Sequence, residues 1–491
     1  MLATISSLFE QLNDAGTRYC HWKSNWNLSE TLAGKTDLDL LVHRRDAAPY
    51  RRILQDLGFR SAVEHGSAPF PSVEHHHALD EASGALVHVH SYYRVISGGS
   101  LAKNYHLPFE EMLLHDVARE GSVTVPSRGA EVIVFVLRMS LKHTTLAELM
   151  MLRRQWANVR RESTWLVTPD ARTEAEALLP VWLPAFDAKL FAAALDALTQ
   201  PASVGRRVVL GRRVRSELRQ YARSGRLRVW LAEVRELAGR ALHRSRGSRK
   251  GLSPAGGGAV IAFVGPEATG KSTLLADAES WLGAHFTVRR VHAGKPPSTL
   301  VTMAPNLLLP ALRSLFPAQR STRVTASPVA EVAERESGNR FPILFGIRAV
   351  LLAYDRRALL TRAYARAANG AIVLSDRYPS LERGALDGAQ LGHEHAPAPA
   401  GAVRRWLATV EARLYRKIPP PDFVIYLTAP LEVALERNRS RSKVEPESYV
   451  LSRYERSSNL RFDHTTVHRV ETDRPLDEVA SEIRRVIWTE L

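Results

Sequence analysis

The chain has 491 residues, which is enough for about two or three domains, and its hydrophobic content of 45% and charged content of 24% are ordinary for a globular protein. Its one cysteine, Cys20, excludes an intramolecular disulfide. The first residues lack the basic start and long apolar core of a secretory signal, and no apolar run reaches membrane-spanning length. We therefore expect a cytoplasmic protein without a transmembrane segment.

Residues 1–110 contain short apolar runs between helical patterns and predict a small α/β or α+β domain. In its TDLDLLV run, Asp37 and Asp39 alternate along a strand, so their carboxylates share one face about 7 Å apart. Two such carboxylates can hold a divalent metal, as in nucleotidyl transfer. A solvated acidic strand edge is the alternative interpretation.

Five histidines follow on two further candidate strands, and they raise a second metal hypothesis: His75, His76, His77, His88 and His90. No cysteine accompanies them, and their spacing matches no zinc signature. A structural or solvated role is therefore the favoured interpretation for this group.

Residues 111–242 alternate apolar clusters with runs rich in Arg, Glu and Ala, and predict a helical, basic bridging region. From Arg206 to Lys250 there are 15 Lys or Arg residues and 3 acids, which accounts for most of the net charge of +16. Such a segment can engage an anionic partner (nucleic acid, an anionic membrane or an acidic protein), or form a solvated helical face. The run WLAEVRELAGRAL, with Trp230, Val234 and Leu237 at helical spacing, predicts a helix that packs on a neighbour.

Residues 243–258 are basic and then rich in Gly, Ser and Pro, and predict a flexible linker. From residue 259 to 491, strand and helix patterns alternate. The strands are expected at AVIAFV, FTVRRV, AIVLSD and DFVIYLTA, and the helices at Ser272–Leu282, Ile347–Ala368, Val403–Tyr415 and Leu431–Asn438. This alternation predicts a doubly wound parallel sheet with ligands at the carboxyl ends of its strands.

A glycine-rich stretch, GPEATGKST, lies between the first of these strands and the first helix. Its backbone N–H groups can surround phosphates, Lys271 can reach the β- and γ-phosphates, and Ser272 can ligate Mg²⁺. The sequence therefore predicts a site for ATP and Mg²⁺ formed by Gly265, Pro266, Glu267, Ala268, Thr269, Gly270, Lys271, Ser272 and Thr273.

Further catalytic candidates follow in this region. Asp376 and Arg377 come directly after a strand, where the carboxylate can hold Mg²⁺ and the guanidinium an acceptor phosphate. Arg356 lies on a helix that can face the same crevice. A later run carries four cations, expected to form a closing lid that stabilises transition-state charge: Arg437, Arg439, Arg441 and Lys443.

In this order, the motifs GPEATGKST, LLAYDRR, SDRYPS, PDFVIYLTAPLEVALERNRSR and ETDRPLDEVASEIRRVI resemble the thymidylate kinase family of nucleoside monophosphate kinases. The resemblance implies a P-loop kinase fold, a possible homodimer, and roles for Glu267 at the acceptor sugar, Arg377 at its phosphate and Arg356 at its base. The chain departs from that family at Leu352, where an aromatic is usual. It also departs in VHAGKPPSTL and in a long insert after SDRYPS.

Residues 1–110 resemble the nucleotidyltransferase superfamily through Lys23-Ser24, the motif GKTDLDLLV and a later VHVH. The resemblance implies a metal held by Asp37 and Asp39, with His90, or else His88, at the position of a third carboxylate. Lys23-Ser24 stands where most members have Gly-Gly or Gly-Ser.

These observations favour ATP-dependent phosphoryl transfer to a nucleoside monophosphate or related small acceptor, by a domain fused to a nucleotidyltransferase-like domain. Two alternatives stay open. One is a regulatory nucleotide-binding protein whose basic segment engages an anionic partner. The other is a kinase of a sugar or another non-nucleotide acceptor.

Overall fold

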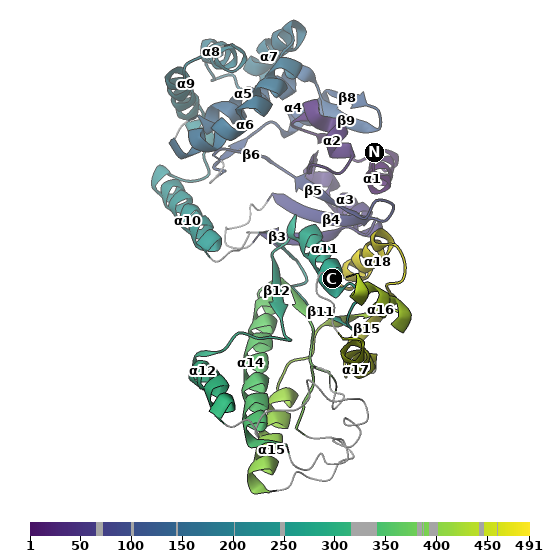
Figure 1. The fold of residues 1–491 in the computed structure, drawn as a ribbon. Coiled ribbons are helices and arrows are strands. Elements are labelled where there is room, and N and C mark those ends of the chain that lie inside the picture. The colour runs from purple at the N-terminus through teal and green to yellow at the C-terminus, as the bar shows by residue number, and fades with distance from the viewer. Residues whose placement is uncertain are drawn as a thin grey trace. The chain divides into compact units, whose positions relative to one another are not determined.

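The computed structural model spans residues 1–491 and describes all of them except 65–71, 100–102, 144–145, 201, 246–250, 316–340, 381–384, 386, 392–400, 441–445 and 459. The chain divides into two compact units, Met1–Lys250 and Gly251–Leu491, each drawn with its helices and strands in Figure 1. Among the described residues, no helix combines the length and apolar character that crossing a membrane requires.

Unit 1 begins with a mixed sheet in the strand order β1-β2-β5-β4-β3. Strand β2 runs parallel to β5, while the β1–β2, β4–β5 and β3–β4 pairs are antiparallel. The strands are β1 (Tyr19–His21), β2 (Leu38–Val42), β3 (Arg60–Glu64), β4 (Val73–Asp80) and β5 (Ala85–Tyr92). The accompanying helices are α1 (Ala3–Asp14), α2 (Leu28–Leu32) and α3 (Ala47–Asp56), with short 3₁₀ turns at Asn25–Asn27 and Arg44–Asp46.

Alternation along β2 separates a core face from a polar face. Leu38 and Leu40 are buried with residues of α1 and α3, while the intervening Asp39 points to the opposite side with His90 of β5. The expected α/β or α+β character of the N-terminal region is confirmed.

Two hairpins and a short helix follow the sheet: β6 (Val95–Ser97) with β7 (Tyr105–Leu107), α4 (Glu110–His115), and β8 (Val117–Glu120) with β9 (Val123–Pro126). The β8–β9 hairpin lies in the stretch from residue 111 that was expected to be helical. Val123 and Val125 are buried, and β-branched residues at alternate positions favour a strand over a helix.

The remainder of unit 1 is helical, as predicted. Its helices are α5 (Arg128–Lys142), α6 (Leu146–Leu166), α7 (Pro169–Trp182), α8 (Ala188–Thr199), α9 (Val204–Glu217) and α10 (Arg226–Ser245), with a 3₁₀ turn at Leu218–Tyr221. Helix α5 is apolar on nearly all sides, and it forms the centre against which α6, α7, α8 and α9 pack.

Helix α10 differs from its prediction, because three of the apolar side chains that were expected to pack on a neighbour are exposed. Trp230, Val234 and Leu237 are 57%, 44% and 45% exposed. The predicted linker 243–258 contains the end of α10 at Ser245 and strand β10 (Leu252–Pro254).

Unit 2 is built on a fully parallel five-stranded sheet in the order β12-β13-β11-β14-β15. Its strands are β11 (Val260–Val264), β12 (Val288–His292), β13 (Ile372–Asp376), β14 (Phe423–Thr428) and β15 (Thr466–Glu471). Its helices are α11 (Lys271–Gly283), α12 (Leu300–Leu315), α14 (Ile343–Ala368), α15 (Ala402–Arg416), α16 (Leu431–Arg439), α17 (Glu447–Ser458) and α18 (Leu476–Glu490). The four predicted strands and four predicted helices are confirmed, with boundaries that differ by a few residues at most.

From β11 the chain runs to β12 and β13 on one side of this strand, and then crosses to β14 and β15 on its other side. Such a reversal of strand order opens a crevice at the carboxyl ends of the strands, where ligands bind in parallel α/β sheets. The loop that leaves β11 at this point is the glycine-rich stretch.

Candidate functional site

The glycine-rich loop turns sharply between β11 and α11. Gly265 has a φ of 137°, and a Cβ there would lie 2.1 Å from the carbonyl oxygen of Leu427. Gly270 adopts a left-handed φ of 80° at the start of α11, and Ala268 also has a positive φ, of 64°. The glycines are therefore required by close backbone approach and by positive φ, and the loop ends at a helix N-terminus, which favours anions.

Lys271 is buried within this loop. Its Nζ donates hydrogen bonds to the carbonyl oxygens of Gly265, at 3.0 Å, and of Pro266. Burial disfavours the charged ammonium and, despite the opposing effect of Glu267, lowers the pKa of Lys271 to about 8. Because both acceptors are neutral carbonyls of the loop itself, the ammonium can exchange them for phosphate oxygens.

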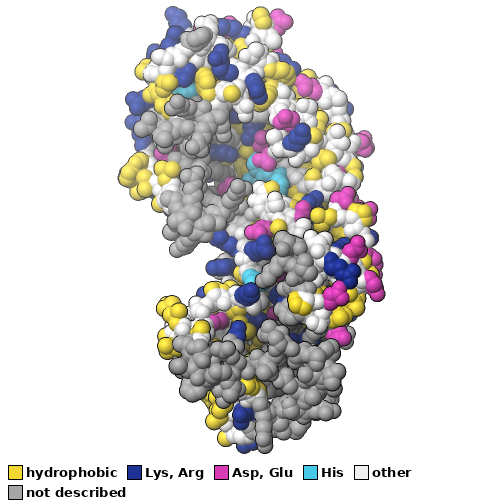
Figure 2. Space-filling view, in the orientation of Figure 1, with side chains coloured by type: hydrophobic (Ala, Val, Ile, Leu, Met, Phe, Trp, Pro, Cys, Tyr) yellow, Lys and Arg dark blue, Asp and Glu magenta, His cyan; other side chains and the backbone are white. Residues whose placement is uncertain are grey.

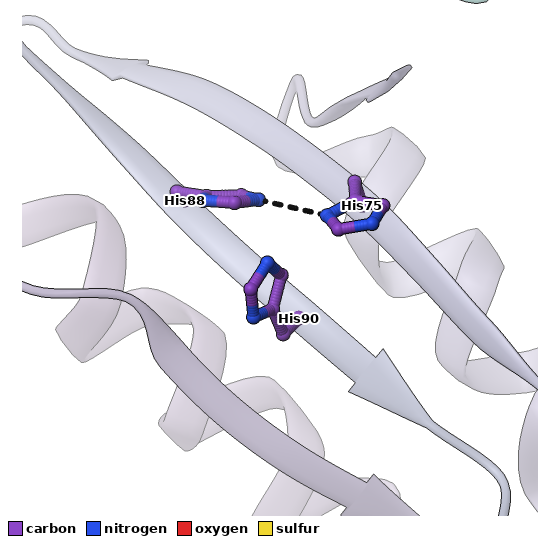
Figure 3. Close-up of side chains that lie close together, drawn as sticks. All are labelled: His75, His88 and His90. Carbon is purple, nitrogen blue, oxygen red and sulfur yellow. Dashed lines mark hydrogen bonds between the residues drawn. The ribbon is translucent and has the colours of Figure 1, made fainter. Parts of the chain in front are cut away.

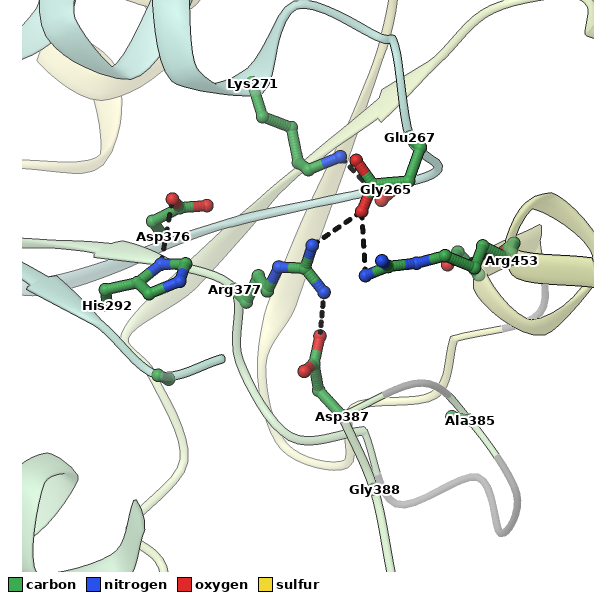
Figure 4. A network of polar contacts seen from close by, with 12 residues as sticks. Gly265, Glu267, Lys271, His292, Asp376, Arg377, Ala385, Asp387, Gly388 and Arg453 are labelled. Atoms are coloured by element: carbon green, nitrogen blue, oxygen red, sulfur yellow. Dashed lines mark hydrogen bonds and ion pairs between the residues drawn. The ribbon is translucent and has the colours of Figure 1, made fainter. Parts of the chain in front are cut away.

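An arginine–carboxylate network lies next to the loop (Figure 4). Glu267 accepts from Arg377, with a distance of 2.6 Å between Oε1 and Nη2, and pairs with Arg453 of α17 at 2.9 Å. Burial acts to raise the pKa of Glu267, but the charges of Lys271, Arg377 and Arg453 outweigh it and lower the pKa. Glu267 is thus held as a carboxylate among cations.

Asp387 is a second carboxylate of this network. Its carboxylate lies 3.5 Å from Nη1 of Arg377 and 3.2 Å from Nη2 of Arg356. The buried Arg356 also donates to the carbonyl oxygens of Ala293 and Asp387. The structure therefore brings the three expected acceptor-binding residues, Glu267, Arg356 and Arg377, into one cluster, together with Asp387 of the insert. A small cavity beside them is lined by Val264, Gly265, Arg377, Tyr378, Asp387, Ser457 and Leu460.

Two oxygen donors suited to Mg²⁺ flank the loop. Asp376 ends β13 in register with Phe263 of β11, so its carboxylate lies at the strand edge from which the loop departs. Ser272 follows Lys271 on the first turn of α11. Carboxylate and hydroxyl oxygens are ligands that Mg²⁺ accepts, so these residues fit the ion. Nδ1 of His292 lies 3.0 Å from the Asp376 carboxylate.

The expected lid arginines are separated in the structure. Arg437 donates to Thr472 after β15, and Arg439 pairs with Glu447 at the surface. Arg441 and Lys443 lie outside the described residues. Arg453, which no local pattern singles out, pairs with Glu267 of the loop from helix α17.

In unit 1, the structure joins both strand aspartates to histidines. Asp37 Oδ1 lies 2.8 Å from Nδ1 of His88, and Asp39 Oδ1 lies 3.2 Å from Nδ1 of His90. Asp39 also forms an ion pair of 3.0 Å with Lys23. Burial alone would raise the pKa of Asp39, but Lys23 and His90 lower it well below its usual range. Of the three candidate metal ligands, Asp39 and His90 are therefore paired, with Lys23 beside Asp39, whereas Asp37 is paired with His88.

The parallel sheet, the glycine-rich loop and the buried lysine are compatible with an α/β nucleotide-binding fold. No family model matches the chain. The uncharacterised ATP-binding protein YghR of Escherichia coli K12 is 25% identical to it over 237 residues, which are 46% of this chain and 86% of YghR. YghR of E. coli O6:H1 gives the same values.

A shorter stretch is similar to a probable thymidylate kinase of Archaeoglobus fulgidus. The two proteins are 38% identical over 84 residues, which are 16% of this chain and 43% of the kinase. The chain is thus similar to an ATP-binding protein over nearly half its length and to a kinase over a sixth of it.

Proposed function

We propose that unit 2 binds ATP and transfers its γ-phosphoryl group to a small acceptor, of which nucleoside monophosphates are the first class to test. The observation that carries this proposal is the network in which Arg377 and Arg453 converge on Glu267 of the glycine-rich loop. A loop that only bound ATP would not need two further guanidinium groups beside it. A phosphoryl-transfer site needs protein cations that contact both the donor and the acceptor.

Each residue has a defined role in this proposal. Lys271 leaves the loop carbonyls and neutralises charge on the β- and γ-phosphates. Arg377 binds the acceptor phosphate through its planar guanidinium, and Arg356 contacts the remainder of the acceptor. Glu267 orients both Arg377 and the acceptor hydroxyl groups.

Ser272 and Asp376 would hold Mg²⁺, which neutralises phosphate charge when bound. Positioning and electrostatics supply the catalysis, because phosphoryl transfer asks little covalent chemistry of the protein.

The similarity to YghR supports the ATP part of the proposal, and the shorter similarity to a probable thymidylate kinase supports the kinase part. Thymidylate itself is not favoured as the acceptor, because Leu352 replaces the aromatic expected for stacking and Asp387 of the insert enters the acceptor cluster. Sugars and other non-nucleotide acceptors therefore belong in the same test.

The experiment measures ADP release from Mg·ATP across nucleoside monophosphates, sugars and sugar phosphates. Lys271→Ala serves as the inactive variant, and Lys417→Ala, an exposed lysine after α15, serves as the matched control. We expect one acceptor class to stimulate turnover in the wild type and in Lys417→Ala but not in Lys271→Ala. ATP binding without stimulation by any acceptor would favour a regulatory nucleotide-binding protein instead.

The nucleotidyltransferase hypothesis for residues 1–110 stays a prediction. The Lys23–Asp39 ion pair bears on it, because a metal held by Asp39 would have to compete with an ammonium 3.0 Å away. Incorporation of labelled nucleotide, compared between the wild type and Asp37→Asn, tests it directly.

A further inference from the structure

Three imidazole rings of unit 1 converge on one point, outside the nucleotide site of unit 2. His88 and His90 alternate on β5 and so share a face, and His75 of β4 lies directly opposite His90 in the antiparallel register. One ligand nitrogen from each ring lies within 4.8 Å of the others, and Nδ1 of His75 is 3.2 Å from Nε2 of His88. Figure 3 shows the three rings turned toward a common centre.

A carboxylate lies next to the other nitrogen of each ring. Nδ1 of His88 faces Asp37 at 2.8 Å, and Nδ1 of His90 faces Asp39 at 3.2 Å. Nε2 of His75 faces Glu64 at 3.7 Å. Metal-binding histidines commonly donate their second N–H to a carboxylate, which fixes the tautomer and turns the free lone pair toward the metal.

The two nearest ring nitrogens have the spacing of two ligands on one ion. Nδ1 of His75 and Nε2 of His88 lie 3.2 Å apart, within hydrogen-bond distance, and each nitrogen can bind a metal in place of the shared proton when its ring carries its hydrogen on the other nitrogen. A zinc ion bound tetrahedrally at 2.0–2.1 Å holds its ligand nitrogens about 3.3 Å apart, close to the observed separation.

We propose that His75, His88 and His90 bind a divalent transition metal ion of the zinc type, with Asp37, Asp39 and Glu64 orienting the rings. Imidazole nitrogen suits zinc, cobalt, nickel and copper, whereas magnesium prefers oxygen ligands. The aspartates thus act through the histidines rather than as metal ligands. Three protein ligands leave a fourth tetrahedral position for water or an exchangeable ligand.

The cluster is accessible to an incoming ion. The side chains of His75 and His90 are 13% and 19% exposed. Histidine side chains gather at the surface of the region that Figure 1 labels β5, as the space-filling view in Figure 2 shows.

The experiment uses the full chain without a histidine tag, freed of metal by a chelator and then titrated with Co²⁺ and with Zn²⁺. We expect one ion per chain to bind, with a visible Co²⁺ absorption band of tetrahedral type. His75→Ala and His90→Ala should abolish that band. His115→Ala, an exposed histidine of the same unit, should bind as the wild type does.

The positioning carboxylate is tested by Asp37→Asn, which should retain the tetrahedral band but bind Co²⁺ about 10- to 100-fold more weakly. Circular dichroism melting and the conservative variant His75→Gln separate loss of the metal from loss of the fold. Wild-type protein that binds no Co²⁺ or Zn²⁺ would overturn the proposal. So would folded His75 and His90 variants that bind Co²⁺ as tightly as the wild type.

Discussion

Binding of ATP should draw a proton onto Lys271, and the size of this effect follows from the environment of its ammonium group. In the free protein, burial lowers the pKa of Lys271 to about 8. Phosphate oxygens around Nζ favour the charged form, so the lysine of the complex stays protonated across the same range. Below pH 8 the free protein already carries the proton, whereas above pH 8 the proton must be taken up on binding.

The magnitude is set by the protonated fraction in the free protein. With a pKa of about 8, that fraction falls from about 0.9 at pH 7 to about 0.1 at pH 9, so the Kd for Mg·ATP should weaken about tenfold, or about 1.4 kcal/mol. At pH 8, binding should take up about half a proton. Titration calorimetry in two buffers of different ionisation enthalpy measures this uptake directly.

Lys271→Arg is the informative variant, because a guanidinium stays protonated over this whole range. Binding of Mg·ATP to this variant should take up almost no protons at pH 8. The Kd of the variant for Mg·ATP should change between pH 7 and pH 9 only as far as the titration of ATP itself requires. Lys417→Met should behave as the wild type does. Equal uptake in wild type and Lys271→Arg would refute the assignment of the titrating group to Lys271.

Three further predictions concern single side chains. Gly265→Ala should lower the free energy of unfolding of unit 2 by about 3 kcal/mol or more, because the new Cβ would meet the Leu427 carbonyl. Denaturant titrations measure this loss. Gly283→Ala is the control and should cause no such loss, because the space around Gly283 is open. Burial raises the pKa of Glu131 to about 7, so its stabilising contribution is full below pH 4.5 and is lost as the pH rises through 7. Glu131→Gln should therefore remove a pH dependence of up to about 3 kcal/mol between pH 4.5 and pH 7, and an unchanged profile would contradict this. Asp387→Asn should lower the KM for a phosphate-bearing acceptor at low salt, since it removes the anion that occupies Arg377; a raised KM would indicate that Asp387 positions the arginine instead.

The sequence predicts the scaffold of unit 2 well, because its signals are local. Apolar runs of strand length, helical periodicity and the spacing of Gly265, Gly270 and Lys271 each lie within a few residues. Asp376 and Arg377 could be placed at the site for the same reason, since the end of a buried parallel strand fixes their position.

The partners of these residues could not be predicted in the same way. Arg453 meets Glu267 from a helix near the end of the chain, and Asp387 reaches Arg356 and Arg377 from an insert without a periodic pattern. Only the tertiary packing determines which of the many arginines contacts Glu267. The exposed apolar residues of α10 show the same limit, since periodicity identifies the face of a helix but not what covers it.

The histidine cluster depends on strand register, which composition does not reveal. Alternation places His88 and His90 on one face, but the pairing of His75 with His90 follows from the β4–β5 alignment. A shift of one residue would have turned His75 to the opposite face of the sheet.

In the proposed kinase, Asp387 forms ion pairs with Arg356 and Arg377, the two arginines that would bind the acceptor. A phosphate entering there would replace an anion that is already present, so arrival of the acceptor is an exchange rather than a neutralisation. Few screening ions need be displaced when one negative group substitutes for another. Affinity for the acceptor should then vary only gently with ionic strength, although the crevice is rich in arginine.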